Sequence, residues 1–271
     1  MLKWKLTAII VLCYSVLTAQ VLPKQDKAVY QASFEITFQT DSTNPTSLVH
    51  EQAILLIGKQ LTKFESANKM LRDSLLYNDN TQPNKTITQL QLGKIPKTKF
   101  LFEIYQYNHQ VIYRDQIMTE RFQYTETPDF NWQLGSNDTT IAGYRCQSAT
   151  CNYGGRNYTA WFTDEIPIPT GPYKFFGLPG FIVAVEDSAH QVQFILTGFK
   201  KLADNYIITP SQQNYTQVTK SVFLETLKKY KANPSMAMNN TLAALKINID
   251  ESAKNTASEK LKKENNLIEK F

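Results

Sequence analysis

The residues best suited to catalysis or metal binding are few and lie far apart in this chain of 271 residues. The three histidines, His50, His109 and His190, form no zinc-ligating motif with carboxylates, and no Gly-x-Ser-x-Gly nucleophile motif occurs. One local cluster, Glu186–His190, combines carboxylates, a hydroxyl and an imidazole, but its place after an apolar run is typical of a turn. We therefore predict a protein that is not an enzyme and that has no metal and no cofactor.

Two cysteines, Cys146 and Cys151, lie close together in the sequence. On one straight strand their Cα atoms would be about 16 Å apart, with the side chains on opposite faces. A disulfide needs a Cα separation of about 4.4–6.8 Å, and the intervening Ser-Ala-Thr contains no turn-forming residue. Two separate half-buried thiols are the favoured interpretation, and a disulfide is the alternative.

A dense aromatic block in residues 143–181 supplies the candidates for binding an apolar ligand. On the concave face of a curved sheet they would line a groove, whereas the favoured alternative for any one of them is core packing. Arg156 and Lys174 could meet an anionic headgroup, with an ion pair to Asp164 or Glu165 as the favoured alternative. The predicted ligand-binding residues are Trp161, Phe162, Tyr173, Phe175, Phe176 and Phe181.

The same block contains six of the ten glycines, and these glycines, together with the prolines among them, predict a series of turns. Leu178-Pro179-Gly180-Phe181 predicts a type II turn, with proline second and glycine third. Gly154-Gly155 predicts a hairpin turn, and Pro167 and Pro169 exclude an ordinary central strand. The predicted structural motif is Gly177, Leu178, Pro179 and Gly180.

The run Gly171-Pro-Tyr-Lys-Phe-Phe-Gly-Leu-Pro-Gly-Phe-Ile182 resembles the signature of the GLPGLI family of exported bacterial proteins, with Phe181 where the name has leucine. The upstream run from Gly154 to Pro169 and Gly143-Tyr-Arg-Cys146 are also similar to the family pattern. The resemblance implies an envelope protein without an assigned biochemical activity. The strand-rich body also resembles half-barrel proteins of the LolA type, which implies lipid-modified or apolar cargo.

Alternation of apolar and polar residues predicts strands through most of residues 28–208. The clearest case places Tyr30, Ala32, Phe34, Ile36 and Phe38 on one face. Short connections between the strands favour an antiparallel meander. Further strands are predicted at 53–57, 61–66, 100–107, 110–118, 130–134, 143–149, 158–163, 180–186 and 191–200.

Two segments have helical spacing. Residues 68–77 place Met70, Leu71, Leu75 and Leu76 on one side, and residues 219–231 do the same with Val222, Phe223, Leu227 and Tyr230. The predicted fold class is mainly β: a curved antiparallel sheet or half-barrel that wraps around one or both helices. Residues 20–232 form the single predicted domain, and 233–271 form a Lys/Glu-rich helical or flexible tail.

Residues 1–19 are typical of a secretory signal peptide, with Lys3 and Lys5 before the apolar run Leu6–Leu17. No other run is long enough to span a membrane, so no transmembrane span is predicted in the mature chain. Residues 217–271 carry ten lysines and six carboxylates, whereas residues 20–216 carry 17 basic and 18 acidic residues. The basic balance therefore belongs to the tail, and we predict no nucleic-acid partner.

We predict an exported non-enzymatic envelope protein, in the periplasm or associated with the outer membrane of a Gram-negative bacterium. It would bind or carry an apolar ligand such as a lipid or an acylated protein. The alternative is an interaction or scaffold module for an outer-membrane protein partner, with residues 250–271 as an exposed docking arm. A hydrolase that uses Glu186, Asp187 and His190 is the least favoured hypothesis.

Overall fold

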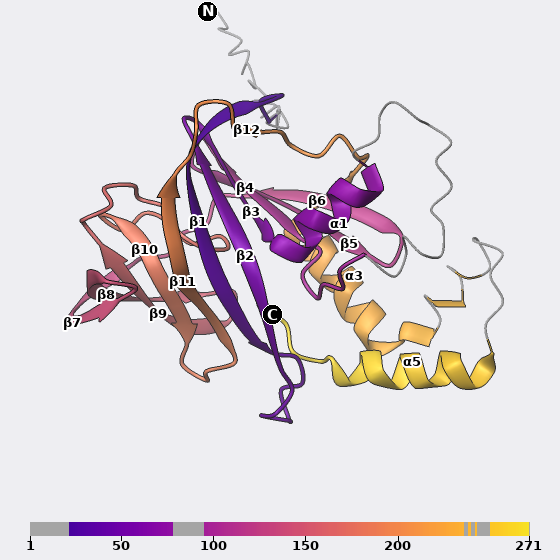
Figure 1. Cartoon of the computed structure of the whole chain (residues 1–271). Coiled ribbons are helices and arrows are strands. Elements are labelled where there is room, and N and C mark those ends of the chain that lie inside the picture. Colours follow the sequence, from indigo (N-terminus) through magenta and orange to yellow (C-terminus); the bar gives the residue numbers. More distant parts are fainter. Residues whose placement is uncertain (1–21, 78–94, 236–237, 240–241, 243–249, 271) are drawn as a thin grey trace, which may run out of the picture.

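The computed structural model describes residues 22–77, 95–235, 238–239, 242 and 250–270, and shows one large curved sheet with helices against it (Figure 1). The helices are α1 Ala67–Tyr77, α3 Lys220–Ala232 and α5 Glu251–Lys263. The predicted signal peptide and most of the loop predicted between residues 78 and 98 lie outside the described residues. The described strands are β1 Asp26–Gln39, β2 Leu48–Gly58, β3 Leu61–Ser66, β4 Glu103–Tyr107, β5 Gln110–Ile117, β6 Glu120–Glu126, β7 Gln133–Ile141, β8 Tyr144–Tyr153, β9 Arg156–Thr163, β10 Phe181–Asp187, β11 Val192–Lys201, β12 Ile207–Ile208 and β13 Thr216–Gln217.

The sheet consists of two antiparallel meanders, β1 to β6 and β7 to β11, which join where β1 pairs with β11. The strands β6 and β7 therefore lie far apart in the strand order, yet only residues 127–132 connect them. A connection this short reaches at most about 25 Å when it is fully extended. The sheet must therefore curve until its two ends approach, and the predicted curved antiparallel sheet is confirmed. Among the described strands only the short β13 pairs in parallel, with β6.

The side chains of β1 show how the alternating pattern builds the core. Ala32, Phe34 and Ile36 are fully buried, and Phe34 meets Phe64 and Phe181 with ring centroids 6.2 and 6.1 Å apart. These contacts join β3 and β10, which come from different meanders, so this face is the inside of the curve. We call it the inner face. The outer face carries a smaller apolar cluster that includes Leu56, Leu61 and Tyr105.

Several strand predictions differ from the structure in extent. The strand β6 was not predicted, although Phe122 and Tyr124 alternate with polar residues in it. The strand predicted at Phe130–Leu134 begins only at Gln133, because Asn131 has a φ of 45° that breaks the extended backbone. The strand β7 then continues through polar residues that are mostly exposed, which is possible because it forms an edge of the sheet.

The helix α3 packs on the inner face, where Phe223 is buried against Tyr113 and Tyr124. Thr219 caps it by accepting a hydrogen bond from the Val222 N–H. Val222 itself is 47% exposed, so the predicted apolar face is correct for Phe223 and wrong for Val222. Among the described residues, no helix combines the length and apolar character needed to cross a membrane.

The helix α1 lies on the outer face, so the sheet does not wrap around it (Figure 1). The predicted apolar side is wrong for Leu71 and Leu75, which are 52% and 54% exposed. The buried side instead carries Lys69, whose ammonium group reaches carboxylates of the sheet. A helix can therefore be held by a buried ion pair where the apolar pattern predicts hydrophobic packing.

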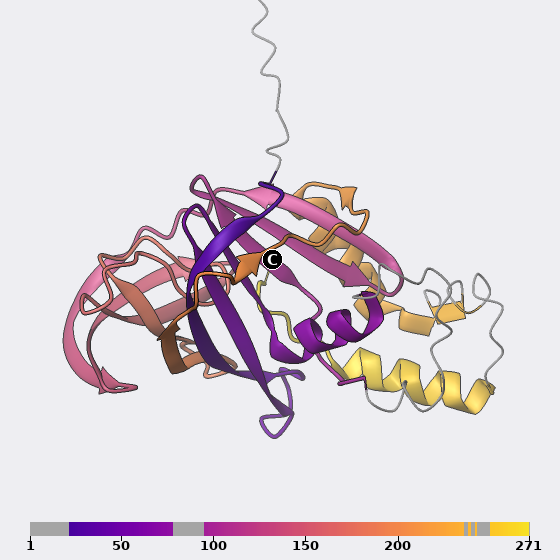
Figure 2. The ribbon, with the colours of Figure 1, turned by 45° about the horizontal axis from the view of Figure 1, so that its top comes forward.

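The chain after α5 turns back to the sheet (Figure 2). We call residues 264–270 the C-terminal strap. The Asn266 N–H donates to Thr40 O at the end of β1 (3.0 Å), and the Lys270 N–H donates to Gly154 O in the β8–β9 turn (2.5 Å). Asn266 and Glu269 are buried, so the strap is part of the folded body and is not the solvated appendage that its composition predicts.

Candidate ligand-binding site

The β8–β9 hairpin brings the first part of the family-like motif against the C-terminal strap. Tyr153 pairs with Arg156, and Gly154 and Gly155 between them have φ values of 55° and 72°, which confirms the predicted two-residue turn. A Cβ atom at Gly154 would lie 2.8 Å from Glu269 Cγ, and one at Gly155 would lie 3.0 Å from Lys270 Cβ. Glycine is therefore needed at both positions, because the turn requires positive φ values and the strap leaves little room for a Cβ atom.

Arg156 holds the C-terminal strap through hydrogen bonds from its guanidinium group. Its buried guanidinium donates to Asp187 Oδ2 (2.6 Å), to Asn266 Oδ1 (2.6 Å) and to the carbonyl oxygens of Leu267 and Ile268 (2.5 and 2.9 Å). The predicted ion pair with Asp164 or Glu165 is wrong, because Arg156 lies at the opposite end of β9 from those residues. The guanidinium therefore pairs with Asp187 and with the C-terminal strap inside the folded protein.

Lys174 lies buried inside the curved sheet, where it is part of a cluster of ion pairs. Its ammonium group is fully buried, donates to Glu126 Oε1 (2.5 Å) and Tyr124 Oη (2.7 Å), and forms an ion pair with Glu269. Lys220 Nζ lies 2.7 Å from Glu126 Oε2 and 2.6 Å from Glu269 Oε2, so two lysines and two glutamates alternate. Four tyrosine rings surround the Lys174 ammonium at 4.5–6.0 Å: Tyr113, Tyr124, Tyr153 and Tyr173.

The structure places the six predicted ligand-binding aromatics mainly in the inner core. Phe162, Phe175 and Phe181 are buried there, and Phe175 packs against Tyr158 with centroids 4.9 Å apart. Trp161 and Phe176 are half-buried against the same core. Tyr173 is the member of the set that also lines a cavity, and its hydroxyl donates to Glu269 Oε1 (2.7 Å). Ligand contact by these side chains stays a prediction.

The Leu-Pro-Gly segment is not the predicted type II turn. A type II turn would be closed by a hydrogen bond from the Phe181 N–H to Leu178 O. In the structure the Phe181 N–H donates to Ile166 O instead (3.0 Å), and Leu178 O accepts from the Gly180 N–H (2.8 Å). Gly180 has a φ of 154°, and a Cβ atom there would lie 2.1 Å from Thr163 O. Glycine is needed because the strand β9 passes so close. Gly177 has a φ of 89°, Leu178 is buried and Pro179 is exposed.

An open cavity of about 410 Å³ lies between the sheet, α3, α5 and the C-terminal strap. We call it the aromatic pocket. Its walls on the sheet side are mainly aromatic, and its walls on the helix side are mainly aliphatic. The apolar lining is Phe38, Phe100, Leu101, Phe102, Tyr113, Met118, Tyr124, Tyr173, Phe223, Leu224, Leu227, Tyr230, Leu261, Leu267 and Ile268.

The polar groups of the aromatic pocket fall into two sets. Lys99, Lys231 and Glu264 lie at its partly exposed side, and Glu264 forms an ion pair with Lys99. Deeper in the pocket, Asp115 accepts a hydrogen bond from the Tyr113 hydroxyl (2.9 Å), and burial raises the pKa of this carboxyl to about 6. The aromatic pocket therefore combines mainly apolar walls with a charged rim and with carboxyl groups inside that have partners of their own, such as Asp115.

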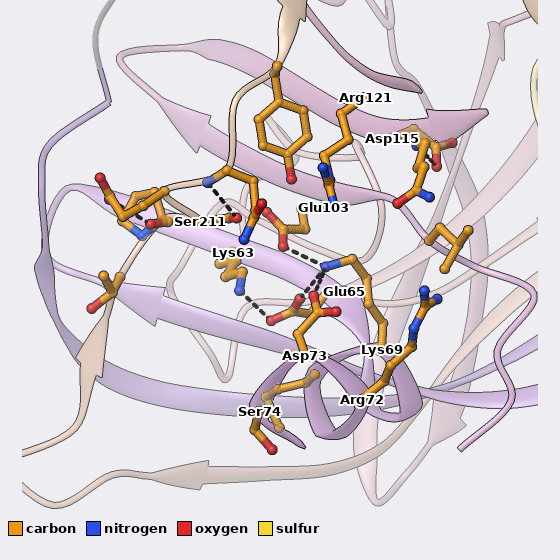
Figure 3. Close-up of a pocket in the computed structure, with 18 residues that line it drawn as sticks. Lys63, Glu65, Lys69, Arg72, Asp73, Ser74, Glu103, Asp115, Arg121 and Ser211 are labelled. Atoms are coloured by element: carbon orange, nitrogen blue, oxygen red, sulfur yellow. Dashed lines mark hydrogen bonds and ion pairs between the residues drawn. The ribbon is translucent and has the colours of Figure 1, made fainter. Parts of the chain in front are cut away.

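A second cavity, of about 330 Å³, lies on the outer face beneath α1 (Figure 3). We call it the charged pocket. Lys69 Nζ lies 2.5 Å from Glu103, 2.6 Å from Asp73 and 3.4 Å from Glu65, and Lys63 lies 2.5 Å from Glu65. Although burial alone raises the pKa of Glu103, the two lysines lower it to about 2. This network holds α1 on the sheet.

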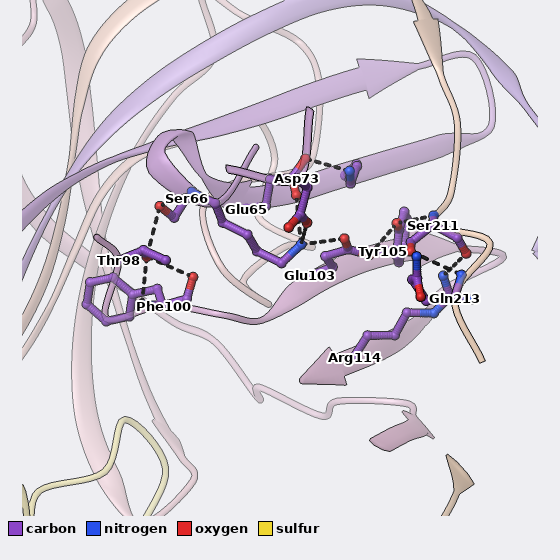
Figure 4. Close-up of polar contacts among 12 residues, drawn as sticks. Glu65, Ser66, Asp73, Thr98, Phe100, Glu103, Tyr105, Arg114, Ser211 and Gln213 are labelled. Carbon is purple, nitrogen blue, oxygen red and sulfur yellow. Dashed lines mark hydrogen bonds and ion pairs between the residues drawn. The ribbon is translucent and has the colours of Figure 1, made fainter. Parts of the chain in front are cut away.

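The carboxylates of the charged pocket offer oxygen atoms within 4.8 Å of one another, as metal ligands would. The Lys69 ammonium already lies among Glu65, Asp73 and Glu103 and supplies the positive charge. Glu103 also accepts a hydrogen bond from the Tyr105 hydroxyl (2.8 Å), which in turn accepts one from the Ser211 N–H (3.3 Å; Figure 4). The observed contacts are thus those of a structural ion-pair network.

The cluster at residues 186–190 is built as a turn. Asp187 is buried and accepts hydrogen bonds from the backbone N–H groups of Gln191 (2.7 Å) and Val192 (2.8 Å) while it pairs with Arg156. His190 is exposed and lies 3.3 Å from Glu186. The Asp187 carboxylate therefore holds the turn and the Arg156 side chain.

Cys146 and Cys151 are separate, buried thiols in the structure. Burial raises the pKa of the Cys151 thiol to about 12 and raises that of Cys146 as well. The separate thiols agree with the favoured sequence interpretation, but both are buried and not half-buried as that interpretation had them.

Comparison with known proteins finds one family match over a short region and two similar solved structures. The family described as a protein of unknown function, Porph_ging, matches residues 154–184. No curated protein matches the chain. Two solved structures of PNGF-II, in space groups P21 and C2, are similar at 13% and 11% identity, with TM-scores of 0.49 and 0.50. The matches cover 75% of this chain but only 34% and 33% of those chains, so the chain spans about a third of their length.

At this identity the likeness to PNGF-II concerns the fold alone. The resemblance to LolA-type carriers stays a prediction. The matched residues 154–184 include the Gly-Gly-Arg turn, Lys174 and the Leu-Pro-Gly segment. These residues also belong to the motif that the sequence resembles. The match therefore confirms the predicted family: this chain carries the motif region of the GLPGLI family, whose function is unknown.

Proposed function

We propose that this protein is an exported, non-enzymatic envelope protein that binds a ligand with an apolar chain in the aromatic pocket. The observation that carries the proposal is the pocket itself, about 410 Å³ with predominantly apolar walls. Protein interiors are close-packed, whereas ligand sites are concave, mostly apolar and about 300–1,000 Å³ in volume. The aromatic pocket has the size and lining of such a site.

The construction of the pocket also supports ligand binding. Rigid aromatic side chains come from β5, such as Tyr113, and from the segment just before β4, such as Phe102, while α3 supplies Leu224 and Leu227. The fourth wall is the C-terminal strap, which Arg156 and Lys174 hold through the contacts described above. The family-like motif thus has a physical role in this proposal: it positions a wall of the pocket.

Two further observations support export and the absence of catalysis. Residues 1–19 have the charged start and apolar run of a secretory signal peptide, which supports export. The carboxylates near the pocket are held by lysines or a tyrosine hydroxyl, as Glu269 and Asp115 show. These groups stabilise the folded protein, and the proposal assigns them no role in bond making or breaking.

The test begins with protein purified from its native envelope, whose extracted ligands are identified by mass spectrometry. In parallel, the neutral fluorophore N-phenyl-1-naphthylamine probes the pocket of recombinant protein. Leu227→Trp should fill the pocket and weaken fluorophore binding about tenfold or more. Val222→Trp places the same side chain on the exposed side of α3 and should leave binding unchanged.

Far-UV circular dichroism and urea unfolding would show that both variants fold. A folded Leu227→Trp protein that binds the fluorophore as tightly as the parent would overturn the proposal. The absence of any fluorophore binding, together with native protein that carries no extractable ligand, would do so as well.

A further inference from the structure

We propose that the aromatic pocket selects an amphiphile with a single apolar chain and an anionic headgroup, which pairs with Lys99 and Lys231 at the rim. This inference rests on the proposed function and adds the chemical class of the ligand. It begins from three charged side chains that line the pocket at its exposed side: Lys99, Lys231 and Glu264. Their side chains are 40%, 23% and 17% exposed, whereas Phe100 and Phe102 are buried.

The rim contains more positive than negative charge. Glu264 forms an ion pair with Lys99 through Oε1, and its other oxygen, Oε2, lies 4.0 Å from Lys231 Nζ. Two ammonium groups therefore share one carboxylate. Burial and the nearby Lys99 lower the pKa of Lys231, while Glu264 and, more weakly, Asp115 act in the opposite direction. A second anion beside Lys231 would compensate the remaining charge.

The other ionisable groups of the pocket do not provide that anion at the rim. Glu269 lies at the deep end, where Lys174 and Lys220 pair with it. Asp115 is held by the Tyr113 hydroxyl and the Gln116 N–H, and burial moves its pKa toward neutrality. A carboxylate or phosphate on an incoming ligand is the complementary group.

Charge and apolar surface are also separated in space as an amphiphile requires. The rim lysines come from the segment before β4 and from the last turn of α3. Leu227 and Tyr230 of α3 line the same pocket. An apolar chain would occupy the interior while its anionic headgroup stays at the rim, where it displaces or joins Glu264.

The test compares ligands that differ only in the headgroup. Decanoate, decanol and decylamine displace N-phenyl-1-naphthylamine at pH 7.5, below their aggregation concentrations. We expect decanoate to bind about tenfold more tightly than decanol, as a charge-assisted contact provides, and decylamine to bind most weakly. The preference for decanoate should fall as salt is raised, because the rim is partly exposed.

Two sets of variants assign the preference to the rim. The double variant Lys99→Gln/Lys231→Gln should lose the preference for decanoate and keep the affinity for decanol. Lys97→Gln/Lys229→Gln removes two exposed lysines, each two residues away, and should bind all three ligands like the parent. Glu264→Gln should strengthen decanoate binding several-fold, because the internal competitor is gone.

The outcomes separate this inference from the proposed function. If decanol and decanoate displace the fluorophore equally, the pocket binds apolar chains and the headgroup inference is overturned. If the double rim variant folds and keeps the full preference, the assignment to Lys99 and Lys231 is overturned. If no ligand displaces the fluorophore, or the fluorophore does not bind, the proposed function itself fails.

Discussion

Replacing Glu269 by glutamine should cost a large part of the protein's stability, because this carboxylate anchors the C-terminal strap. Its side chain is 4% exposed and pairs with Lys174, whose side chain is fully buried. Glutamine keeps the shape but removes the charge, so the Lys174 ammonium retains only Glu126 as an anionic partner. Breaking a buried ion pair on one side costs about 3–5 kcal/mol of unfolding free energy.

The pKa of Glu269 gives a second measure of the same interaction. Burial alone would raise it, but Lys174 and Lys220 lower it from 4.5 to about 2. The lowered pKa corresponds to about 3 kcal/mol of stability at neutral pH, in agreement with the first value. Because the folded pKa is the lower one, this stability is complete above the unfolded pKa and is lost as the pH falls from about 4.5 toward 2.

Urea unfolding followed by circular dichroism measures the effect at several pH values. At pH 7 the variant should be less stable than the parent by about 3 kcal/mol, and at pH 3 the difference should shrink to about 1 kcal/mol. Glu225→Gln, on the exposed side of α3, is the matched control and should change little. Equal urea midpoints for Glu269→Gln and the parent at pH 7 would refute the reasoning that the strap is held by buried charge.

Two further predictions concern the motif and the cysteines. Gly180→Val should destabilise the fold by at least about 1–3 kcal/mol in thermal or urea unfolding, because its φ is 154° and Thr163 O blocks the Cβ position. Gly177→Ala, where the space is open, should cost less, and equal costs would contradict the steric argument. Cys146 and Cys151 should resist a thiol reagent at pH 8 and both react in urea, as counted by mass spectrometry, because burial raises their pKa values. A chain that gains no adduct in urea would instead contain a disulfide.

The sequence predicted the parts of the fold that depend on neighbours along the chain. The alternation in β1 predicted its buried face, and Gly154-Gly155 predicted the β8–β9 turn that φ values of 55° and 72° confirm. The motif block predicted the family that the comparison confirms. In each case the signal lies within one strand, one turn or one short segment, where backbone geometry and the side-chain period are sufficient.

The sequence could not predict the partners of the buried charges. Lys174 pairs with Glu269, 95 residues away, and Arg156 contacts the strap 110–112 residues away. A local pattern reports that a face is buried, but it does not report which distant segment covers it. For the same reason the leucines of α1 misled the prediction, because buried carboxylates of β3 and β4 attract Lys69 instead.

What the sequence by itself determined is a mainly β chain with a signal-like start, a turn-rich aromatic motif and helical segments near its end. The tertiary structure alone decided where those parts meet. The six-residue connection between β6 and β7 forces the sheet to curve, and the inside of the curve brings Glu126, Lys174 and Glu269 together. Because a pocket is made by elements that are distant in sequence, the aromatic pocket and its charged rim exist only once the sheet has curved and the strap has returned to it.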